Sequence, residues 1–290
     1  MKHKVKRLFP VLILMLGTGW FLIWESYHQL SLTKIHLESE KCTAPFSFIL
    51  LGDLHDNTFG RDNEALIRLI EQARPDFVLM IGDMLNGDSD GSDRLERLIA
   101  ALSRRAPVYY SLGNHELDYI RSGDEKLVSR LVAAGAIVLE LEARDWQLRG
   151  QRLRIGGMYD YAFALDNRNT TSREAMNRET YDFLADFQDT EAFTLMLAHR
   201  PESFVLGQAS RTWEIDLVVS GHDHGGQVVL PLLGGLWAGD QGWFPEYIHG
   251  LHKKDKLNIL ITSGLGSHAQ RLPRFNNPPE VMLCMISPKE

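Results

Sequence analysis

Cysteine is nearly absent from this chain, since only Cys42 and Cys284 occur among its 290 residues. Two cysteines so far apart fit neither a thiolate zinc site nor a disulfide framework. They can form a single bridge in an oxidising compartment, or they can pack as small apolar side chains. The sequence leaves both alternatives open, and any metal site must be built without paired thiolates.

Excess positive charge is also lacking. The chain has 31 lysines and arginines against 38 aspartates and glutamates, which gives a formal net charge of -7. Without a basic surface, nucleic acid is not expected as the main partner. An anionic substrate must therefore be attracted locally, by bound cations. The hydrophobic content of 44% and the chain length allow the sizeable core of an ordinary globular protein.

The N-terminus differs from the rest of the chain. Residues 1–7 are rich in lysine and arginine, and residues 8–24 contain no charged side chain. This pattern predicts a cytoplasmic basic tail followed by a transmembrane helix or an uncleaved signal anchor, because basic residues stay on the cytoplasmic side. Residues 25–45 would form a tether. We therefore expect a single-pass protein of the cell membrane with an extracytoplasmic domain; a secretion signal is the alternative interpretation.

From residue 46 onward, strand-like and helix-like segments alternate. Short apolar runs predict strands, and amphipathic stretches between them predict helices. The expected strands are 46–51, 77–81, 108–112, 153–158, 193–197, 215–219, 258–262 and 281–286, with an additional edge strand at 34–37. The expected helices are 62–74, 93–105, 124–134 and 172–187. This order predicts one α/β domain over residues 46–290.

Five of the expected strands are followed by side chains that can bind a metal ion. These side chains are Asp53 and His55, Asp83, Asn114 with His115, His199, and His222 with His224. Ligands in open α/β architectures gather at the carboxyl ends of strands, so we expect these groups to converge. Nitrogen and oxygen donors without thiolates suit manganese, iron or zinc better than calcium. The set is too large for one ion and predicts a two-metal site of the kind that acts at phosphorus.

Taken together, these residues resemble the signature of the calcineurin-like metallophosphoesterase superfamily. The matching motifs are Asp53-x-His55, Gly82-Asp83, Gly113-Asn114-His115-Glu116, His199 and Gly221-His222-x-His224, all in order. Residues 197–202, 225–227, 263–266 and 274–276 are similar to its membrane-anchored bacterial branch of exported phosphodiesterases and UDP-2,3-diacylglucosamine pyrophosphatases. The resemblance implies a four-layer α-β-β-α sandwich, with helices outside two central β-sheets.

The resemblance also implies a role for each matching residue. Asp53, His55 and His224 would hold one divalent cation, Asp83 would bridge two, and Asn114, His199 and His222 would complete the second site. The cations would be Mn²⁺, Fe²⁺/Fe³⁺ or Zn²⁺. His115 would face the substrate as general acid or as stabiliser of the leaving oxygen. The implied reaction is hydrolysis of a phosphoester, with a phosphodiester or pyrophosphate favoured, and with a metal-bridging hydroxide as nucleophile.

The identity of the substrate is less constrained by the sequence. Arg200 and Arg271 can bind substrate phosphate through paired hydrogen bonds, or they can be ordinary surface and packing arginines. Residues 230–251 are rich in leucine and aromatic side chains. They can form an apolar lip for the acyl chains of a lipid-linked substrate, or they can simply pack the loop.

The other function class is a catalytically silent metal-binding scaffold. Such a protein would be expected to have lost a ligand or the substrate-facing histidine, and none is lost in this chain. The histidines outside the pattern are expected at the surface or at an interface: His3, His28, His36, His249, His252 and His268.

Overall fold

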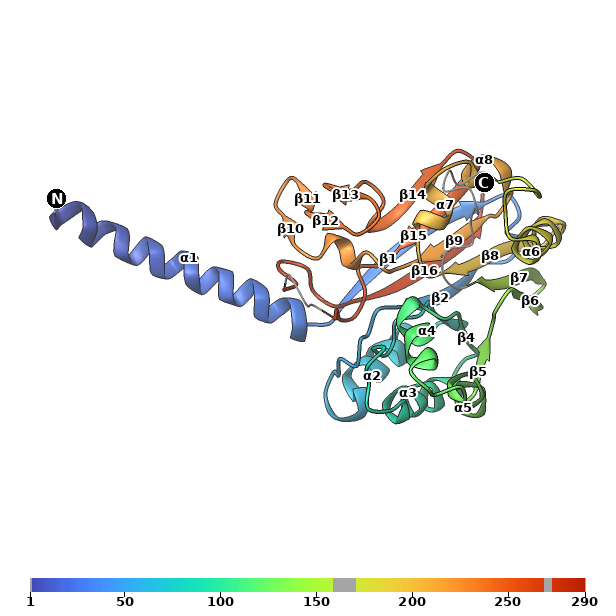
Figure 1. The fold of residues 1–290 in the computed structure, drawn as a ribbon, viewed down its shortest axis with the longest axis horizontal. Coiled ribbons are helices and arrows are strands. Elements are labelled where there is room, and N and C mark those ends of the chain that lie inside the picture. Colours follow the sequence, from blue (N-terminus) through green and yellow to red (C-terminus); the bar gives the residue numbers. More distant parts are fainter. Residues whose placement is uncertain (1, 159–170, 269–272, 290) are drawn as a thin grey trace.

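Two six-stranded sheets form the centre of the molecule (Figure 1). The computed structural model describes residues 2–158, 171–268 and 273–289, without the side chains of residues 2–9 and 11. The first sheet has the order β1 (Ser31–Ser39), β16 (Glu280–Pro288), β2 (Phe46–Leu51), β3 (Phe77–Met80), β4 (Val108–Tyr110), β5 (Ala136–Val138). The second has the order β14 (Gly250–Lys254), β15 (Leu257–Ile261), β9 (Leu217–Ser220), β8 (Phe193–Ala198), β7 (Gln151–Met158), β6 (Glu142–Leu148).

Parallel pairing dominates the middle of both sheets. Strands β2 to β5 are parallel in the first sheet, and β7, β8, β9 and β15 are parallel in the second. Strands β3, β8 and β9 are buried along their whole length. Continuous apolar sequences such as Phe77–Met80 are typical of parallel strands covered on both faces. Parallel strands also carry their carboxyl ends to a common edge, which fixes where a site can form.

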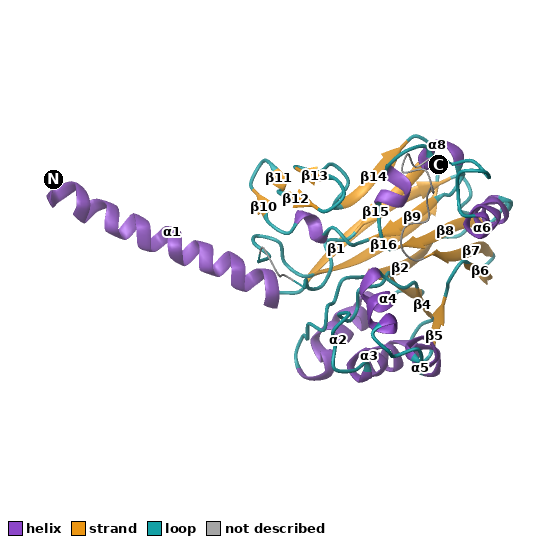
Figure 2. Cartoon of the chain, in the orientation of Figure 1, coloured by secondary structure: helices purple, strands orange, loops and turns teal. Residues whose placement is uncertain are grey.

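Helices cover the outer faces of the two sheets (Figure 2). Those beside the first sheet are η1 (Arg61–Asn63), α2 (Glu64–Ala73), α3 (Asp93–Ser103), α4 (Asn114–Arg121) and α5 (Leu127–Ala133). Those beside the second are α6 (Arg178–Gln188), α7 (Glu202–Val205) and α8 (Ala209–Thr212). One turn of 3-10 helix, η2 (His224–Gly226), precedes two short ribbons, β10 (Val229–Leu230) with β11 (Gly234–Gly235) and β12 (Trp237–Ala238) with β13 (Gly242–Trp243).

Three apolar clusters hold these layers together. The first lies between the outer helices and the first sheet, where Leu66 and Ile70 of α2 are buried four residues apart on one helix face. The second lies between the sheets and is lined by side chains such as Phe48 and Leu195. The third joins the second sheet to α6, α7 and α8. The fold is therefore a mixed α/β arrangement, as the sequence predicts.

Both cysteines lie in the cluster between the sheets. Cys42 and Cys284 are buried and free. Of the two alternatives for the pair, the structure has the packed thiols.

Helix α1 (Lys2–His28) projects away from the sheets (Figure 1). In the part of the chain that the structure describes, no helix is both long and apolar enough to cross a membrane. This finding overturns the predicted transmembrane helix over residues 8–24 and the predicted single-pass membrane localisation with an extracytoplasmic domain. The apolar stretch of α1 contains Pro10, and its last turn is polar and docked on the domain: the buried Ser26 hydroxyl accepts a hydrogen bond from the Asn277 amide.

The segment expected as a tether contains a full strand of the first sheet. Strand β1 spans Ser31–Ser39, longer than the predicted edge strand at 34–37, and pairs in parallel with β16. Most predicted strands agree with the structure within two residues at either end. Helix α4, which begins at Asn114, was not predicted, because Gly113 and Asn114 resemble a turn. Helix α6 begins at Arg178 rather than at 172, since the Asn177 side chain caps it by accepting from the Glu179 amide.

Candidate metal centre

The loops after β2, β3, β4, β8 and β9 bring the predicted ligands together. The structure contains three overlapping groups in which one ligand atom of each residue lies within 4.8 Å of the others. The groups are Asp53 with His55 and His224, His55 with Asp83 and His115, and Asp83 with His199 and His222. The groups are linked by His55 and Asp83, so the seven residues form one continuous cluster.

The backbone at these positions is unusual. Asp53, His55, Asp83, His222 and His224 have φ values between 48° and 69°, in the left-handed region. Side chains other than glycine rarely adopt this conformation, which costs roughly 1–3 kcal/mol for each residue. The turns that follow the strands therefore keep these side chains pointed into the cluster at a cost in stability, as is common at functional sites.

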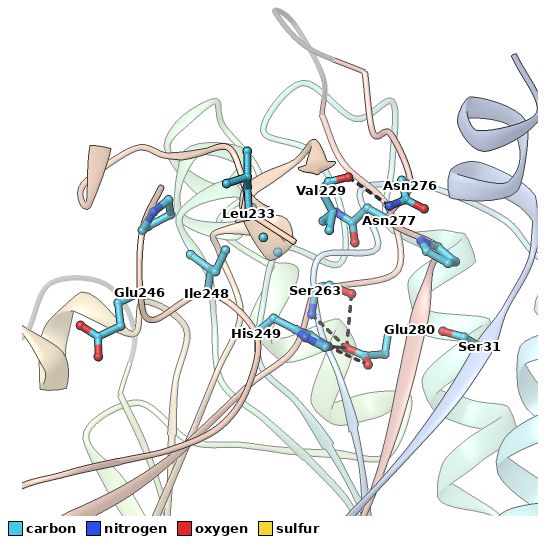
Figure 3. Close-up of a pocket in the computed structure, with 15 residues that line it drawn as sticks. Ser31, Val229, Leu233, Glu246, Ile248, His249, Ser263, Asn276, Asn277 and Glu280 are labelled. Atoms are coloured by element: carbon cyan, nitrogen blue, oxygen red, sulfur yellow. Dashed lines mark hydrogen bonds and ion pairs between the residues drawn. The ribbon is translucent and has the colours of Figure 1, made fainter. Parts of the chain in front are cut away.

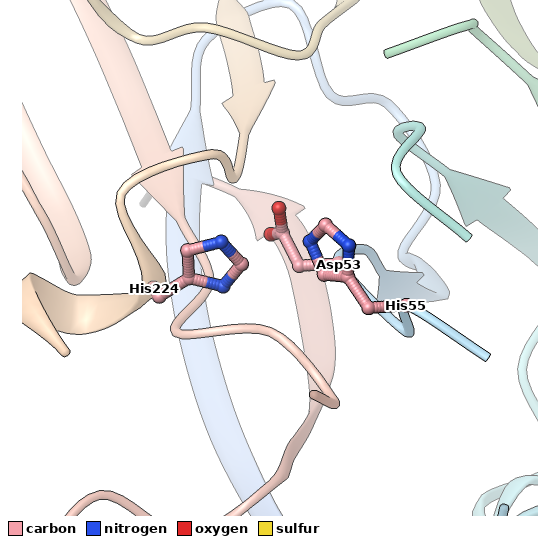
Figure 4. Close-up of side chains that lie close together, drawn as sticks. All are labelled: Asp53, His55 and His224. Atoms are coloured by element: carbon pink, nitrogen blue, oxygen red, sulfur yellow. The ribbon is translucent and has the colours of Figure 1, made fainter. Parts of the chain in front are cut away.

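Figure 4 shows how Asp53, His55 and His224 face one another across the first group. Asp53 is fully buried and accepts the backbone amide of His222 with both carboxylate oxygens, at 3.1 Å each. The Nε2 atom of His55 and the Nδ1 atom of His224 are buried without a hydrogen-bond partner. Two imidazole nitrogens beside a buried carboxylate are therefore available to an ion.

Asp83 is common to the other two groups. Its Oδ2 atom lies 3.1 Å from the Nε2 atom of His199 and 3.8 Å from that of His55. The Nδ1 atom of His222 lies 3.3 Å from the Nε2 atom of His199. Asn114 stands at the start of α4, and its buried Oδ1 atom also has no hydrogen-bond partner. Asn114 directly precedes His115, a member of the cluster, and it offers an oxygen donor atom to a cation.

Hydrogen bonds fix which nitrogen of two histidines carries the proton. The Nδ1 atom of His199 lies 2.7 Å from the carbonyl of Ile81, which can only accept. The Nδ1 atom of His55 lies 2.8 Å from the Oδ1 atom of Asn86, whose amide nitrogen donates to the Asp56 carboxylate at 2.9 Å. In both imidazoles Nδ1 therefore carries a proton, and Nε2 is the nitrogen that faces Asp83.

Glu116 joins the ends of β3 and β4. Its buried carboxylate accepts the backbone amides of Asp83 and Gly113, at 2.7 and 2.8 Å, and the hydroxyl of Tyr110 at 2.8 Å. The Asp83 carboxylate in turn accepts the amide of His115 at 2.8 Å. Glu116 therefore sets the relative positions of Asp83 and the start of α4.

Burial controls the charge of the histidines. It lowers the pKa of His55 to about 4 and holds the pKa values of His222 and His224 well below their ordinary range. These imidazoles are neutral near pH 7, which a metal ligand must be. Burial raises the pKa of Asp53 to about 7, although the charge of His199 opposes that rise.

Asp83 and His199 stabilise each other as a charged pair. Burial disfavours both charges, but attraction from His199 holds the pKa of Asp83 well below its usual range. Attraction from Asp83 correspondingly overcomes burial and raises the pKa of His199 to about 9. The His199 proton thus occupies the position where a cation would meet the Asp83 carboxylate.

These residues fit divalent cations. The donor set consists of neutral imidazoles, buried carboxylates and an amide oxygen, which suits manganese, iron or zinc. Three of its donor atoms, on His55, His224 and Asn114, are buried without a partner in the described chain. An unpartnered buried polar atom is costly in a folded protein, and coordination would remove that cost.

Of the two predicted substrate arginines, one can be placed. Arg200 follows β8 and forms an ion pair with Asp240, at 3.3 Å. Arg271 lies outside the described residues. Within residues 230–251, the side chains of Leu232, Leu233, Trp237, Trp243 and Phe244 are exposed.

A pocket of about 410 Å³ lies beside η2, since Gly225 is one of its lining residues (Figure 3). Its wall includes Gly225, Leu233 and Ile248, and at its base His249 meets Glu280. None of the candidate metal ligands lines it. The pocket is therefore separate from the cluster, although Gly225 directly follows a member of it.

The sequence does not predict one residue that lies beside the cluster. His268, expected at the surface or at an interface, has its ring centroid 5.5 Å from that of His115 and 6.4 Å from that of His55. It lies on the loop after β15, a further parallel strand of the second sheet. One signal could have identified His268. It lies in the loop that follows the expected strand 258–262, and that loop begins with Ser263 and Gly264.

Comparisons with known proteins agree with this geometry. A family model described as calcineurin-like phosphoesterase matches residues 46–226. The phosphodiesterase YaeI of Escherichia coli is 27% identical over 272 residues, which cover 92% of this chain and 89% of that protein. An uncharacterized metallophosphoesterase of Helicobacter pylori is 26% identical, over 95% of this chain and 69% of that protein.

A solved structure is similar in fold. The 5'-nucleotidase precursor of Thermus thermophilus superposes with a TM-score of 0.50 at 15% identity, over 77% of this chain. The matched region is 50% of that nucleotidase, so the similarity concerns the shared fold alone.

Proposed function

Because the chain belongs to the calcineurin-like phosphoesterase family and is a phosphoester hydrolase, we propose that it cleaves phosphodiester or pyrophosphate bonds with two divalent cations. The observation that carries this proposal is the overlap of the three ligand groups through His55 and Asp83. A continuous cluster with more ligand groups than one ion can bind is typical of two-metal hydrolases.

The residues divide between the two cations. Asp53, His55 and His224 would hold one, Asn114, His199 and His222 would hold the other, and Asp83 would serve both. When bound, the cations would polarise the phosphoryl oxygens and lower the pKa of water. Manganese, iron and zinc all suit these donors.

His115 would act on the substrate. Its Nδ1 atom accepts the backbone amide of Gly87 at 3.2 Å, so a neutral His115 carries its proton on Nε2. This atom can donate a hydrogen bond or a proton to the oxygen that leaves phosphorus. One ring nitrogen of His115 also lies within 4.8 Å of a ligand atom of His55 and of Asp83, which supports a role next to the cations.

The test is hydrolysis of bis-(p-nitrophenyl) phosphate by the full chain. Turnover is expected to disappear on metal removal and to return with Mn²⁺. Asp83→Asn is expected to lower kcat/KM by at least about 100-fold, because each 1.36 kcal/mol of lost transition-state stabilisation is tenfold in rate. Asp182→Asn on the exposed face of α6 is the control and is expected to be as active as the parent. A metal-free protein with undiminished turnover, or one that binds no divalent cation, contradicts the proposal.

A second candidate is a phosphodiester that carries an acyl chain. It is favoured by the exposed apolar surface of Leu232, Leu233, Trp243 and Phe244, in the segment that follows η2. The variant Trp243→Ser is then expected to lower kcat/KM for a micellar acyl phosphodiester while leaving bis-(p-nitrophenyl) phosphate hydrolysis unchanged. Equal effects on both substrates exclude this candidate.

A further inference from the structure

Among the described residues, two arginines of the loops around the cluster are already engaged in other contacts. Arg200 is paired with Asp240, and the buried guanidinium of Arg274 donates to the carbonyls of Ser263 and Gly266. Asp53 and Asp83 are buried carboxylic acids, which do not attract an anion. A phosphoryl group needs hydrogen-bond donors in addition to cations. Imidazoles also lie beside the cluster and can donate such hydrogen bonds.

His268 is one of these imidazoles. It stands beside His115, with 5.5 Å between ring centroids, and is half-buried. It belongs to none of the three ligand groups found among the described residues. His268 and His115 thus form a pair of imidazoles beside His55.

The loop that carries His268 is attached to the cluster itself. The amide of Leu265 donates to the carbonyl of Gly52 at 3.1 Å, and the amide of Gly266 donates to the carbonyl of Asp53 at 2.7 Å. Gly266 lies so close to the loop after β2 that an added Cβ would be 2.3 Å from the carbonyl oxygen of Leu54. A side chain at 266 would therefore push the loop away.

Two further contacts hold the same loop from outside. Asn57 donates to the carbonyl of Leu265 at 3.1 Å, and Arg274 donates to the carbonyl of Gly266 at 2.8 Å. The distance from the metal-ligand turn to His268 is therefore set by several backbone hydrogen bonds. A side chain that contacts a substrate must be held at a fixed position, and these hydrogen bonds hold the loop of His268 in this way.

We propose that His268 is a second substrate-contacting imidazole, which binds a non-bridging oxygen of the phosphoryl group while His115 serves the leaving oxygen. This inference rests on the proposed phosphoester hydrolysis and adds a residue that recognises the phosphoryl group. A hydrogen bond between an imidazole and an anionic oxygen is of the stronger, charge-assisted kind.

The experiment compares His268→Gln and His268→Ala with the full-length parent and with His36→Gln, a control on the exposed side of β1. Each protein is loaded with Mn²⁺, its metal content is measured, and its affinity for inorganic phosphate is determined by calorimetry. Both His268 variants are expected to keep the parent's metal content, to bind phosphate about 10-fold more weakly, and to lose about 10–100-fold in kcat/KM. The control is expected to match the parent.

Three outcomes overturn the inference. The first is phosphate affinity within about twofold of the parent in both variants, and the second is loss of bound cation, which would make His268 a metal-positioning residue. The third is a parent that takes up cations but does not bind phosphate. A parent that binds no cation contradicts the proposed function itself and is recognised by its metal content alone.

Discussion

At the scale of single residues, the chemistry of the cluster depends on groups one step behind the ligands. Asn86 is an example, since its Oδ1 atom orients His55 while its amide nitrogen is held by Asp56. This arrangement keeps the proton on Nδ1 and leaves Nε2 free for a cation. Partners of this kind are often as important for metal binding as the ligands they orient.

The first prediction concerns this partner. Asn86→Leu removes the acceptor of the His55 proton, and we expect the affinity for the more weakly bound cation to fall by roughly 10–100-fold. Asn86→Asp restores an acceptor and is expected to recover much of the loss. Cation binding is followed by calorimetry on metal-stripped protein, with Asn258→Leu, remote from the cluster, as control. Unchanged cation affinity in Asn86→Leu would show that His55 needs no such partner.

The sequence predicts the ligands better than their supports. Asp53, His55, Asp83 and the two histidines of the loop after β9 stand at recognisable offsets from strand ends, and the structure brings them together. Asn86 and His268 lie farther beyond their strand ends, and no motif marks them. Their importance arises from contacts between segments far apart in the chain, which depend on how the loops close.

At the scale of elements, one buried side chain organises the loop after β15. Arg274 is fully buried and donates to the carbonyls of Ser263, Gly266 and Asn277 at 2.8–3.0 Å. Its backbone amide donates to the hydroxyl of Tyr27 in the last turn of α1. The sequence shows an arginine near the end of the domain. Only the folded loop shows that all three guanidinium nitrogens of Arg274 donate hydrogen bonds.

The second prediction follows from these hydrogen bonds. Arg274→Met leaves several buried carbonyls without a donor, and each unsatisfied group costs about 1–3 kcal/mol. The free energy of unfolding is therefore expected to fall by roughly 3 kcal/mol or more, and cation affinity should fall with it because the loop supports Asp53. Urea unfolding measures the change, with the exposed Arg61→Met as control. A loss below about 1 kcal/mol would mean that water replaces the guanidinium.

The sequence predicts a strand reliably where a short apolar run has clear ends, and less reliably at the exposed edges of the sheets. Strand β2 agrees with its predicted bounds because a buried parallel strand is a continuous apolar run with a clear end. The antiparallel edge strands β6 and β14 were missed, since their exposed, charged sequences do not read as strands. They exist because a neighbouring strand offers them a hydrogen-bonding edge.

At the scale of the whole molecule, a polar contact joins the two sheets next to the pocket beside η2. Glu280 begins β16 of the first sheet, and His249 directly precedes β14 of the second. The Nε2 atom of His249 lies 3.0 Å from the Glu280 carboxylate, which also accepts the amide of Ser263 at 3.1 Å. The hydrogen bond from His249 lowers the pKa of Glu280 against the effect of burial, and Glu280 raises the pKa of His249.

The last prediction concerns the pH range over which this pair stabilises the fold. A raised histidine pKa contributes stability that is complete below the unfolded value of about 6.5 and is lost as pH rises through the folded value. A lowered glutamate pKa contributes stability that is complete above about 4.5 and is lost as pH falls through the folded value. The pair therefore stabilises the fold most between about pH 4.5 and 6.5.

His249→Gln should remove this maximum. The difference in free energy of unfolding between the parent and His249→Gln is expected to be greatest near pH 5.5 and to shrink above pH 7, as measured by urea unfolding at a series of pH values. Because His249 is about half exposed, solvent screens the pair and the difference should be modest. His252→Gln changes a neighbouring histidine whose ring forms a hydrogen bond with a backbone carbonyl, and this variant should show no such maximum. A difference that is independent of pH would mean that His249 joins the sheets by packing rather than by charge.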